Sequence, residues 1–235
     1  MKGRISSFQS LGTVDGPGVR CVVFLQGCPL HCACCHNPET RDPHRGTEAD
    51  ADELTAKILR FRSYFGKAGG VTVSGGEPLL QAAFVTDLFR KLKTAGIHTA
   101  LDTSGCLWNT EVEELLEYTD LVLLDHKYAD AESYLRFTGE KKETAEHFLD
   151  ELQKRQIPVW LRRVIIPGHT DSEASVLQLK EVADMHPCVQ KVELLPFRKF
   201  CISKYEELKM DFPLRDTPEP DAVLMDHLQQ LLVRT

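Results

Sequence analysis

The chain has 235 residues, of which 42% are hydrophobic, and a formal net charge of −7 at pH 7. Its acidic balance excludes a nucleic-acid binder, because phosphate contacts require clustered Lys and Arg. No run of about 20 apolar residues is present, which excludes a membrane-spanning segment. The start of the chain lacks the apolar core of a signal peptide, so we expect a cytoplasmic protein.

Short apolar runs rich in Val, Leu and Ile alternate with segments of helical spacing. Such alternation indicates a parallel sheet covered by helices, built here from six βα units. Six units suit either a doubly wound sheet or an incomplete barrel, in a single domain over residues 1–235. The predicted strands are 21–26, 70–75, 98–104, 120–127, 157–168 and 189–197. The predicted helices are 49–65, 78–96, 110–119, 131–137, 142–156, 172–186 and 221–233.

In both architectures, function lies in the loops at the carboxyl ends of the strands. The polar and sulfur-bearing candidates of this sequence fall at those ends, which is itself an indication of a site. They are a cysteine-rich loop at 28–35 after the first strand, the SGGE segment at 74–77 after the second, Asp102 in the third, Asp125 and Lys127 ending the fourth, and Arg162 in the fifth.

Four of the eight cysteines lie within eight residues, in the loop after the first predicted strand. Cysteines in a reducing compartment indicate metal binding or catalysis more often than disulfides. Cys28, Cys32 and Cys35 form a C-x3-C-x2-C pattern. Thiolates hold 4Fe–4S clusters, normally four to a cluster, so three would leave one iron open to another ligand.

A structural zinc site is the alternative for this loop, with His31 or His36 as a fourth ligand. Zinc ribbons and fingers usually need a second ligand pair at a distance. The remaining cysteines of the carboxyl-terminal part, Cys106, Cys188 and Cys201, are isolated and supply none. The spacing therefore favours the iron–sulfur interpretation over zinc.

The C-x3-C-x2-C loop after the first strand, followed by Gly-Gly-Glu-Pro after the second, resembles the radical S-adenosylmethionine superfamily. This resemblance implies an incomplete (β/α)6 TIM-like barrel. It also implies a 4Fe–4S cluster on Cys28, Cys32 and Cys35, whose open iron binds the methionine part of S-adenosylmethionine. Reductive cleavage of that cofactor then gives methionine and a 5′-deoxyadenosyl radical, while the protein supplies binding and orientation.

Two segments of this pattern have plainer alternatives. Gly75, Gly76 and Glu77 would let backbone approach a ligand while Glu77 accepts from an ammonium, although GGEP is also a common turn between a strand and a helix. Cys34 stands where the superfamily usually has an aromatic or bulky residue near the adenine. It is either a small buried hydrophobe or a spare thiol.

Charged residues on the later strands complete the expected cofactor site. Asp125 and Lys127 lie two apart, so both point to one face, and charges on so apolar a run must pair or line a polar cavity. By resemblance, Asp102, Lys127 and Arg162 contact the ribose and carboxylate of the cofactor. Asp102 and Asp125 with Thr103 are also expected near a monovalent cation. Ordinary salt bridges at a barrel mouth are the alternative.

A longer stretch, GTVDGPGVRCVVFLQGCPLHCACCHNPET, resembles the activating enzymes of glycyl radical enzymes. DTSG, LDHK, VWLRRVIIPG and VELLPF continue the match along nearly the whole chain. Between Cys35 and Gly75 there is no cysteine, so we expect no ferredoxin-like insert, as in the short members that act on pyruvate formate-lyase. The resemblance implies abstraction of a glycine Cα hydrogen in that partner, with flavodoxin or ferredoxin as electron donor, by a monomeric enzyme.

Three further residues follow from this narrower resemblance. Asp15 in the Asp-Gly-Pro-Gly segment and His36 in CHNP are expected near the incoming peptide, although Asp-Gly-Pro-Gly is also strong turn chemistry. Arg198 stands where the family has a histidine near the cofactor, and its five donors suit ribose or carboxylate. The alternatives are an activase of another glycyl radical enzyme, a small-molecule radical enzyme, and a zinc-binding interaction module.

Overall fold

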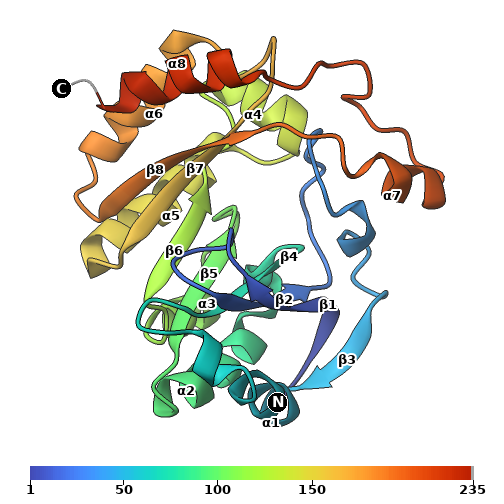
Figure 1. Cartoon of the computed structure of the whole chain (residues 1–235), viewed down its shortest axis with the longest axis vertical. Coiled ribbons are helices and arrows are strands. Elements are labelled where there is room, and N and C mark those ends of the chain that lie inside the picture. The colour runs from blue at the N-terminus through green and yellow to red at the C-terminus, as the bar shows by residue number, and fades with distance from the viewer. Residues whose placement is uncertain (234–235) are drawn as a thin grey trace. The chain divides into compact units, whose positions relative to one another are not determined.

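The computed structural model of the chain describes residues 1–233 (Figure 1). Contacts within the chain group it into two compact units. The first comprises Met1–Pro29 and Glu39–Leu123, and the second comprises Leu30–Pro38 and the chain from Leu124 onward. Strand β6 (Leu121–Asp125) begins in the first unit and ends in the second. No helix within residues 1–233 is long and apolar enough to cross a membrane.

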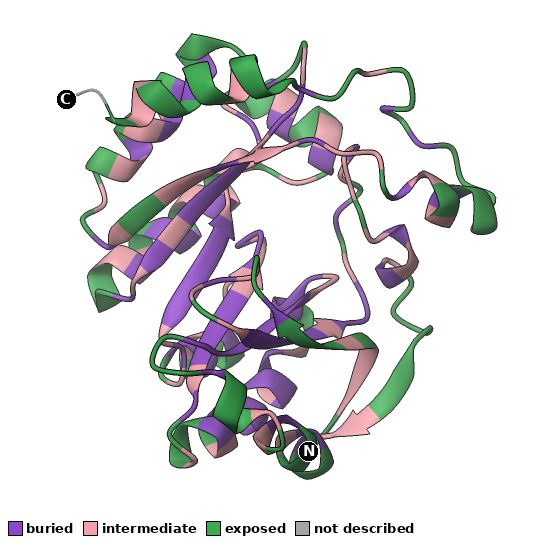
Figure 2. Cartoon of the chain, viewed as in Figure 1, coloured by how far each residue is buried: buried purple, intermediate pink, exposed green. Residues whose placement is uncertain are grey.

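The first unit is built on strands in the order β3-β1-β2-β4-β5-β6. β2, β4 and β5 are parallel neighbours, whereas β1 runs antiparallel to both β2 and β3. Their bounds are β1 (Lys2–Gly12), β2 (Arg20–Leu25), β3 (Thr47–Asp50), β4 (Gly70–Gly75) and β5 (His98–Thr103). β2 and β4 are buried along nearly their whole length, as Figure 2 shows, because apolar runs of this kind are covered on both faces.

The helices of the first unit pack beside one another, α1 against α2 and α2 against α3. They are α1 (Ala51–Leu59), α2 (Ala82–Thr94) and α3 (Thr110–Leu116), with short 3-10 turns at Pro38–Thr40, Arg62–Tyr64 and Pro78–Gln81. The Asp50 carboxylate accepts from the first backbone N–H groups of α1, and Asn109 caps α3 in the same way. Such caps satisfy donors that have no partner inside a helix, so they fix where each helix begins.

The second unit contains the parallel strands β7 (Val159–Ile165) and β8 (Val189–Pro196), which follow β6 in the sheet order. Helix α6 packs against β8 and α8, and α8 also contacts β8. The helices are α4 (Ala131–Thr138), α5 (Lys142–Arg155), α6 (Glu173–Asp184), α7 (Ile202–Glu207) and α8 (Ala222–Val233). Asp130 and Ser172 cap the starts of α4 and α6, and Gly139 ends α4 in the left-handed conformation at φ 79°.

The predicted α/β fold with six parallel strands, of the partial TIM-barrel type, is confirmed. The sheet additionally has the two antiparallel strands β1 and β3, and helix α7 was not predicted. The predicted helix over 49–65 is too long, since α1 covers only Ala51–Leu59 and a 3-10 turn follows. The helix predicted over 78–96 likewise begins as a 3-10 turn, with Pro78 first and Glu77 as its cap.

Candidate functional site

The Gly-Gly-Glu segment leaves β4 in a conformation that side chains at the two glycines would prevent. Gly75 has φ 113°, and a Cβ there would collide with the backbone of Leu25. A Cβ on Gly76 would meet the carbonyl oxygen of Gly27. Glycine is therefore required at both positions, because the chain at 75–76 lies directly against the end of β2 and the residues after it.

The Glu77 carboxylate is buried and occupied by donors of the first unit. Its Oε1 accepts from Thr103 Oγ1 at 2.5 Å and Leu79 N at 3.2 Å, and its Oε2 accepts from Ser104 N at 3.0 Å and Ser104 Oγ at 2.6 Å. Only 2% of Glu77 is exposed. Three of these four bonds join the segment after β4 to the end of β5 and the residue after it, so the carboxylate already has a structural task. The expected contact of Glu77 with an ammonium stays a prediction.

Asp102 and Thr103 lie at the end of β5 in the same unit. Asp102 Oδ2 accepts from Ser74 Oγ at 2.7 Å, so the two neighbouring strands end in polar groups that are bonded to each other. Thr103 Oγ1 donates to Glu77 and accepts from the Gly105 backbone N–H at 3.0 Å. Asp102 is therefore a residue of β5 itself, one position before the strand ends.

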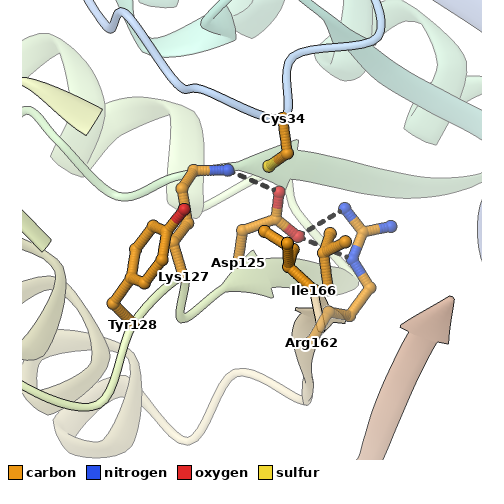
Figure 3. A pocket seen from close by; sticks show the side chains of 7 residues that line it. Cys34, Asp125, Lys127, Tyr128, Arg162 and Ile166 are labelled. Carbon is orange, nitrogen blue, oxygen red and sulfur yellow. Dashed lines mark hydrogen bonds and ion pairs between the residues drawn. The ribbon is translucent and has the colours of Figure 1, made fainter. Parts of the chain in front are cut away.

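Asp125 is the centre of the charged group in the second unit. Its Oδ1 accepts from Arg162 Nε at 3.0 Å and lies 2.9 Å from Arg162 Nη2, while its Oδ2 accepts from Lys127 Nζ at 2.9 Å. Figure 3 shows the two cations converging on the carboxylate from opposite sides. Asp125 and Lys127 thus pair with each other, one of the two outcomes expected for charges on so apolar a run, and Arg162 joins them.

The electrostatics of this group follow from two cations that share one anion. Burial opposes ionisation of Asp125, yet Arg162 and Lys127 lower its pKa to about 2. Burial also disfavours the Lys127 ammonium, but Asp125 raises the pKa of Lys127 well above its usual value. All three groups are ionised at neutral pH, so the trio carries one net positive charge. Such a half-buried positive centre suits a carboxylate or other anion of a ligand.

A pocket in the second unit opens beside this trio. Its lining combines the three charged groups with a thiol, a phenol and two aliphatic side chains (Figure 3). The residues are Cys34, Asp125, Lys127, Tyr128, Arg162, Val164 and Ile166. Tyr128, Val164 and Ile166 were not predicted. The aromatic residue directly after Lys127 is a signal that sequence reasoning could have used, whereas Val164 and Ile166 look like ordinary strand residues. An apolar wall with a few convergent charges is the usual composition of a small-molecule site.

Cys34 faces this pocket and also packs against an aromatic cluster. The buried members of that cluster include Tyr128, Tyr134, Phe197 and Tyr205. Burial, followed by the neighbouring Cys32, raises the pKa of Cys34 to about 12, so Cys34 is a neutral thiol at physiological pH. It therefore behaves mainly as the small half-buried hydrophobe that the sequence offered as one of two interpretations.

The backbone of the cysteine loop forms hydrogen bonds within each unit. In the first unit, Cys28 N donates to Arg41 O at 3.3 Å. In the second, Cys35 N donates to Cys32 O at 3.2 Å, and the Cys35 carbonyl accepts from Tyr205 Oη at 3.2 Å. All eight cysteines are thiols outside any disulfide, and Cys28, Cys32 and Cys35 are partly exposed. Within residues 1–233 no three His, Cys, Asp or Glu side chains are already grouped as a metal site.

His36 and Arg198 are brought together, but through the backbone of Arg198. His36 Nε2 donates to Arg198 O at 2.8 Å. The Arg198 guanidinium instead reaches Glu219, with Nη1 3.2 Å from Glu219 Oε2, and the Pro220 carbonyl at 3.4 Å. Asp15, in the first unit, lies in the turn after β1, where its carbonyl accepts from Thr72 Oγ1 at 2.6 Å.

Comparison with known proteins identifies the family. A family model described as a 4Fe-4S single cluster domain matches residues 14–145. The chain is 46% identical over 231 residues to the pyruvate formate-lyase-activating enzyme of Clostridium pasteurianum, covering 98% of this chain and 97% of the relative. The chain belongs to the pyruvate formate-lyase-activating enzyme family. The activating enzyme of Staphylococcus aureus (strain USA300) is 42% identical, with 94% of this chain and 91% of that relative covered.

Solved structures support the fold of this activating-enzyme family member. A domain of pyruvate-formate lyase-activating enzyme from Bacteroides vulgatus aligns with a TM-score of 0.58 at 24% identity, covering 70% of this chain and 93% of that one. Streptococcus suis SuiB bound to its precursor peptide SuiA aligns with a TM-score of 0.71 at 13% identity, covering 90% of this chain and 44% of that one. The activating-enzyme family is one of radical S-adenosylmethionine oxidoreductases, and the chain is therefore an enzyme of this type.

Proposed function

We propose that this enzyme activates a glycyl radical enzyme, pyruvate formate-lyase, by generating a radical on one glycine of that protein. The observation that carries the proposal is the 46% identity over nearly the full length of a relative with this name. The bound cofactors would supply the chemistry: a reduced cluster cleaves S-adenosylmethionine to methionine and a 5′-deoxyadenosyl radical, which removes the glycine Cα hydrogen. The protein residues bind and orient the reactants.

The donor set of the cysteine loop fits a 4Fe–4S cluster with three protein ligands. Cys28, Cys32 and Cys35 are partly exposed thiols, and soft thiolates are the ligands that iron–sulfur clusters take. Three ligands leave one iron open for the amino and carboxylate groups of S-adenosylmethionine. Cys34 is left out of the ligand set, since it faces the pocket beside Asp125.

The residues proposed to contact S-adenosylmethionine are given for each unit by itself. In the second unit, the net positive charge of Lys127 and Arg162 around Asp125 favours a carboxylate, and Cys34 lines the same pocket. Arg198 is proposed only as a weaker contact, because its guanidinium is bonded to Glu219. In the first unit, the residues proposed are Gly75, Gly76, Glu77, Asp102 and Thr103. Asp102, Thr103 and Asp125 are further proposed to lie near a monovalent cation.

The partner side of the proposal concerns the peptide that carries the target glycine. Asp15 and His36 are proposed to lie near that peptide. A low-potential donor, flavodoxin or ferredoxin, is proposed to supply the electron to a monomeric enzyme in the cytoplasm, where thiols stay reduced. We further propose a single radical S-adenosylmethionine domain over residues 1–235 without a ferredoxin-like insert. The family match over residues 14–145 supports it, since that segment includes parts of both compact units.

The test is electron paramagnetic resonance on anaerobically reconstituted protein. The reduced enzyme is incubated with S-adenosylmethionine and pyruvate formate-lyase, and a glycyl doublet is expected in the partner only when this enzyme is present. Other glycyl radical enzymes are run in parallel to establish the choice of partner. Cofactor cleavage without a doublet in any of these proteins would contradict the proposal and favour a small-molecule radical enzyme.

A further inference from the structure

Arg20 is a fully buried cation in β2, on a strand that is otherwise apolar from Cys21 to Val23. Its Nε donates to Thr72 Oγ1 at 2.6 Å, and its Nη2 donates to the Val71 carbonyl at 2.6 Å. The same Nη2 also lies 3.2 Å from His98 Nδ1. Burial lowers the pKa of Arg20 to about 10, opposed by Asp120 and Asp15, so the side chain stays charged at neutral pH.

The remaining nitrogen of the Arg20 guanidinium, Nη1, contacts the Asp-Gly-Pro-Gly turn at residues 15–18. Arg20 Nη1 donates to the Pro17 carbonyl at 3.1 Å. Thr72 accepts from Arg20, and its own hydroxyl donates a hydrogen bond to the Asp15 carbonyl at 2.6 Å. Two carbonyls of the turn are therefore held, one directly by the guanidinium and one through a single hydroxyl. Both holding groups lie on neighbouring strands, whose positions are fixed by the sheet.

The two glycines of the turn show how closely its backbone packs against Arg20 and the residues before β4. Gly16 has φ 117°, and a Cβ there would lie 3.2 Å from Arg20 Cδ. Gly18 has φ 68°, and a Cβ there would lie 2.6 Å from the Gly69 backbone nitrogen. A Cβ would thus crowd the Arg20 side chain at Gly16 and collide with the backbone before β4 at Gly18, so the turn lies directly against both groups.

Burying an arginine contributes little to the free energy of unfolding. Removing a guanidinium from water costs free energy, and apolar replacements of buried ion groups are often neutral or stabilising. The bonds of Arg20 instead fix a geometry, because a planar fork defines the directions of several acceptors at once. The segment it fixes contains Asp15, whose Oδ2 lies 3.1 Å from the position a Cβ on Gly12 would take. The Asp15 carboxylate is thus packed close to Gly12 in the strand before the turn.

We infer that Arg20 and Thr72 are positioning residues for Asp15, holding the 15–18 turn in the single conformation that presents Asp15 to the partner's glycine-bearing peptide. The inference rests on the proposed function, in which Asp15 meets that peptide. We expect neither Arg20 nor Thr72 to contact the peptide. They act by preorganising the backbone that carries Asp15, and a displacement of about 1 Å in such a group can cost two orders of magnitude in rate.

The primary test compares Thr72→Val with Thr72→Ser in the full-length, anaerobically reconstituted enzyme. The valine removes the hydroxyl at nearly constant volume, whereas the serine keeps it. Thr72→Val is expected to lower kcat/KM for glycyl radical formation about tenfold, chiefly through KM for the partner protein. Thr72→Ser is expected to stay within twofold of wild type. Cleavage of S-adenosylmethionine by dithionite-reduced enzyme without partner should be equal in all three proteins.

Thr86→Val is the matched control. Thr86 is another buried threonine of the first unit, and its hydroxyl donates to the Ala82 carbonyl within α2, away from the turn. The Thr86→Val variant should leave the KM for the partner protein unchanged. Equal KM values for wild type and Thr72→Val would overturn the inference, and so would an equal rise in KM for Thr86→Val. Arg20→Lys, which keeps the charge but loses the fork, is the second variant should Thr72→Val fold poorly, and the same rise in KM is expected.

A double-mutant cycle separates action through Asp15 from general damage. If Thr72 works through Asp15, Thr72→Val has no further effect in an Asp15→Asn background, and fully multiplicative losses would contradict the inference. Amide hydrogen exchange gives a readout independent of activity: the segment 13–18 should exchange faster in Thr72→Val than in Thr72→Ser. Unchanged exchange there overturns the positioning role. Absence of a glycyl doublet with the wild-type enzyme would instead overturn the proposed function, so the two failures are distinguishable.

Discussion

Arg162 and Asp125 are joined twice in the second unit, with Arg162 Nε at 3.0 Å and Nη2 at 2.9 Å from the same carboxylate oxygen. The second oxygen of Asp125 is bound by Lys127 at 2.9 Å. Neighbouring strands thus supply an anion and a cation that neutralise each other, and Lys127 leaves one positive charge in excess. This relationship makes Asp125 the residue on which the electrostatics of the pocket depend.

Replacing Asp125 by Asn should therefore destabilise the enzyme. Two largely buried cations would lose the carboxylate that both of them contact, and uncompensated buried charge of this kind costs about 3 kcal/mol. The measurement is the free energy of unfolding from urea titration at pH 7. Asp184→Asn serves as the control, since Asp184 pairs with Lys180 at an exposed position of α6 and should matter much less. Equal losses for the two variants would contradict the central role of Asp125.

The cysteine loop allows a comparison between neighbouring thiols. Cys32→Ala should abolish iron and sulfide incorporation and reductive cleavage of S-adenosylmethionine without unfolding the protein, since Cys32 is a proposed ligand. Cys34→Ala should retain the cluster, because Cys34 faces the pocket and the aromatic cluster. Iron and sulfide analysis after anaerobic reconstitution, with circular dichroism for folding, gives both answers. Full iron loading of Cys32→Ala would refute the ligand assignment, and iron loss in Cys34→Ala would shift it toward Cys34.

Glu77 has a structural role that Glu77→Gln should expose. An amide nitrogen would face donors that now bond to the carboxylate, so at least one of the four bonds would be lost. Because hydrogen bonds to buried charged groups are strong, we expect a loss of about 2 kcal/mol in the free energy of unfolding. Glu48→Gln, at an exposed ion pair with Lys2, is the control. If Glu77 mainly holds the cofactor's amino group, calorimetry would show weaker S-adenosylmethionine binding with an unchanged unfolding midpoint.

The fold was predictable from sequence where burial dictates residue type. β6 is a continuous apolar run that ends in Asp125, and β4 is buried up to its last residue, so the positions of both strands and the pairing of Asp125 with Lys127 could be inferred. β1 was missed because most of its residues are exposed or half-exposed and carry no apolar pattern. The partner of Arg198 depends on the path of the chain between 198 and 220, which no local pattern encodes. The role of Arg20 was also hidden, since a single arginine in an apolar strand does not reveal its acceptors.

His126 predicts how the stability of the enzyme depends on pH. The ring is 1% exposed, its Nδ1 accepts from Arg163 Nη2 at 2.6 Å, and its Nε2 is buried without a hydrogen-bond partner. Burial, together with the neighbouring cation Arg163, lowers the pKa of His126 to about 3. The unfolded chain takes up this proton near pH 6.5, so His126 favours the folded state fully above that pH and progressively less as the pH falls toward 3.

Between pH 7.5 and pH 5.5 this single group should remove about 1.4 kcal/mol from the free energy of unfolding. His126→Asn keeps an acceptor for Arg163 but cannot be protonated in this range, so its stability should fall less over the same interval. His147→Asn, at an exposed position of α5, should follow the wild-type dependence closely. Urea midpoints measured at both pH values for the three proteins test this. If His126→Asn and wild type lose equal stability on acidification, the proton taken up on unfolding belongs to another group, and the neutral ring beside Arg163 does not limit stability in acid.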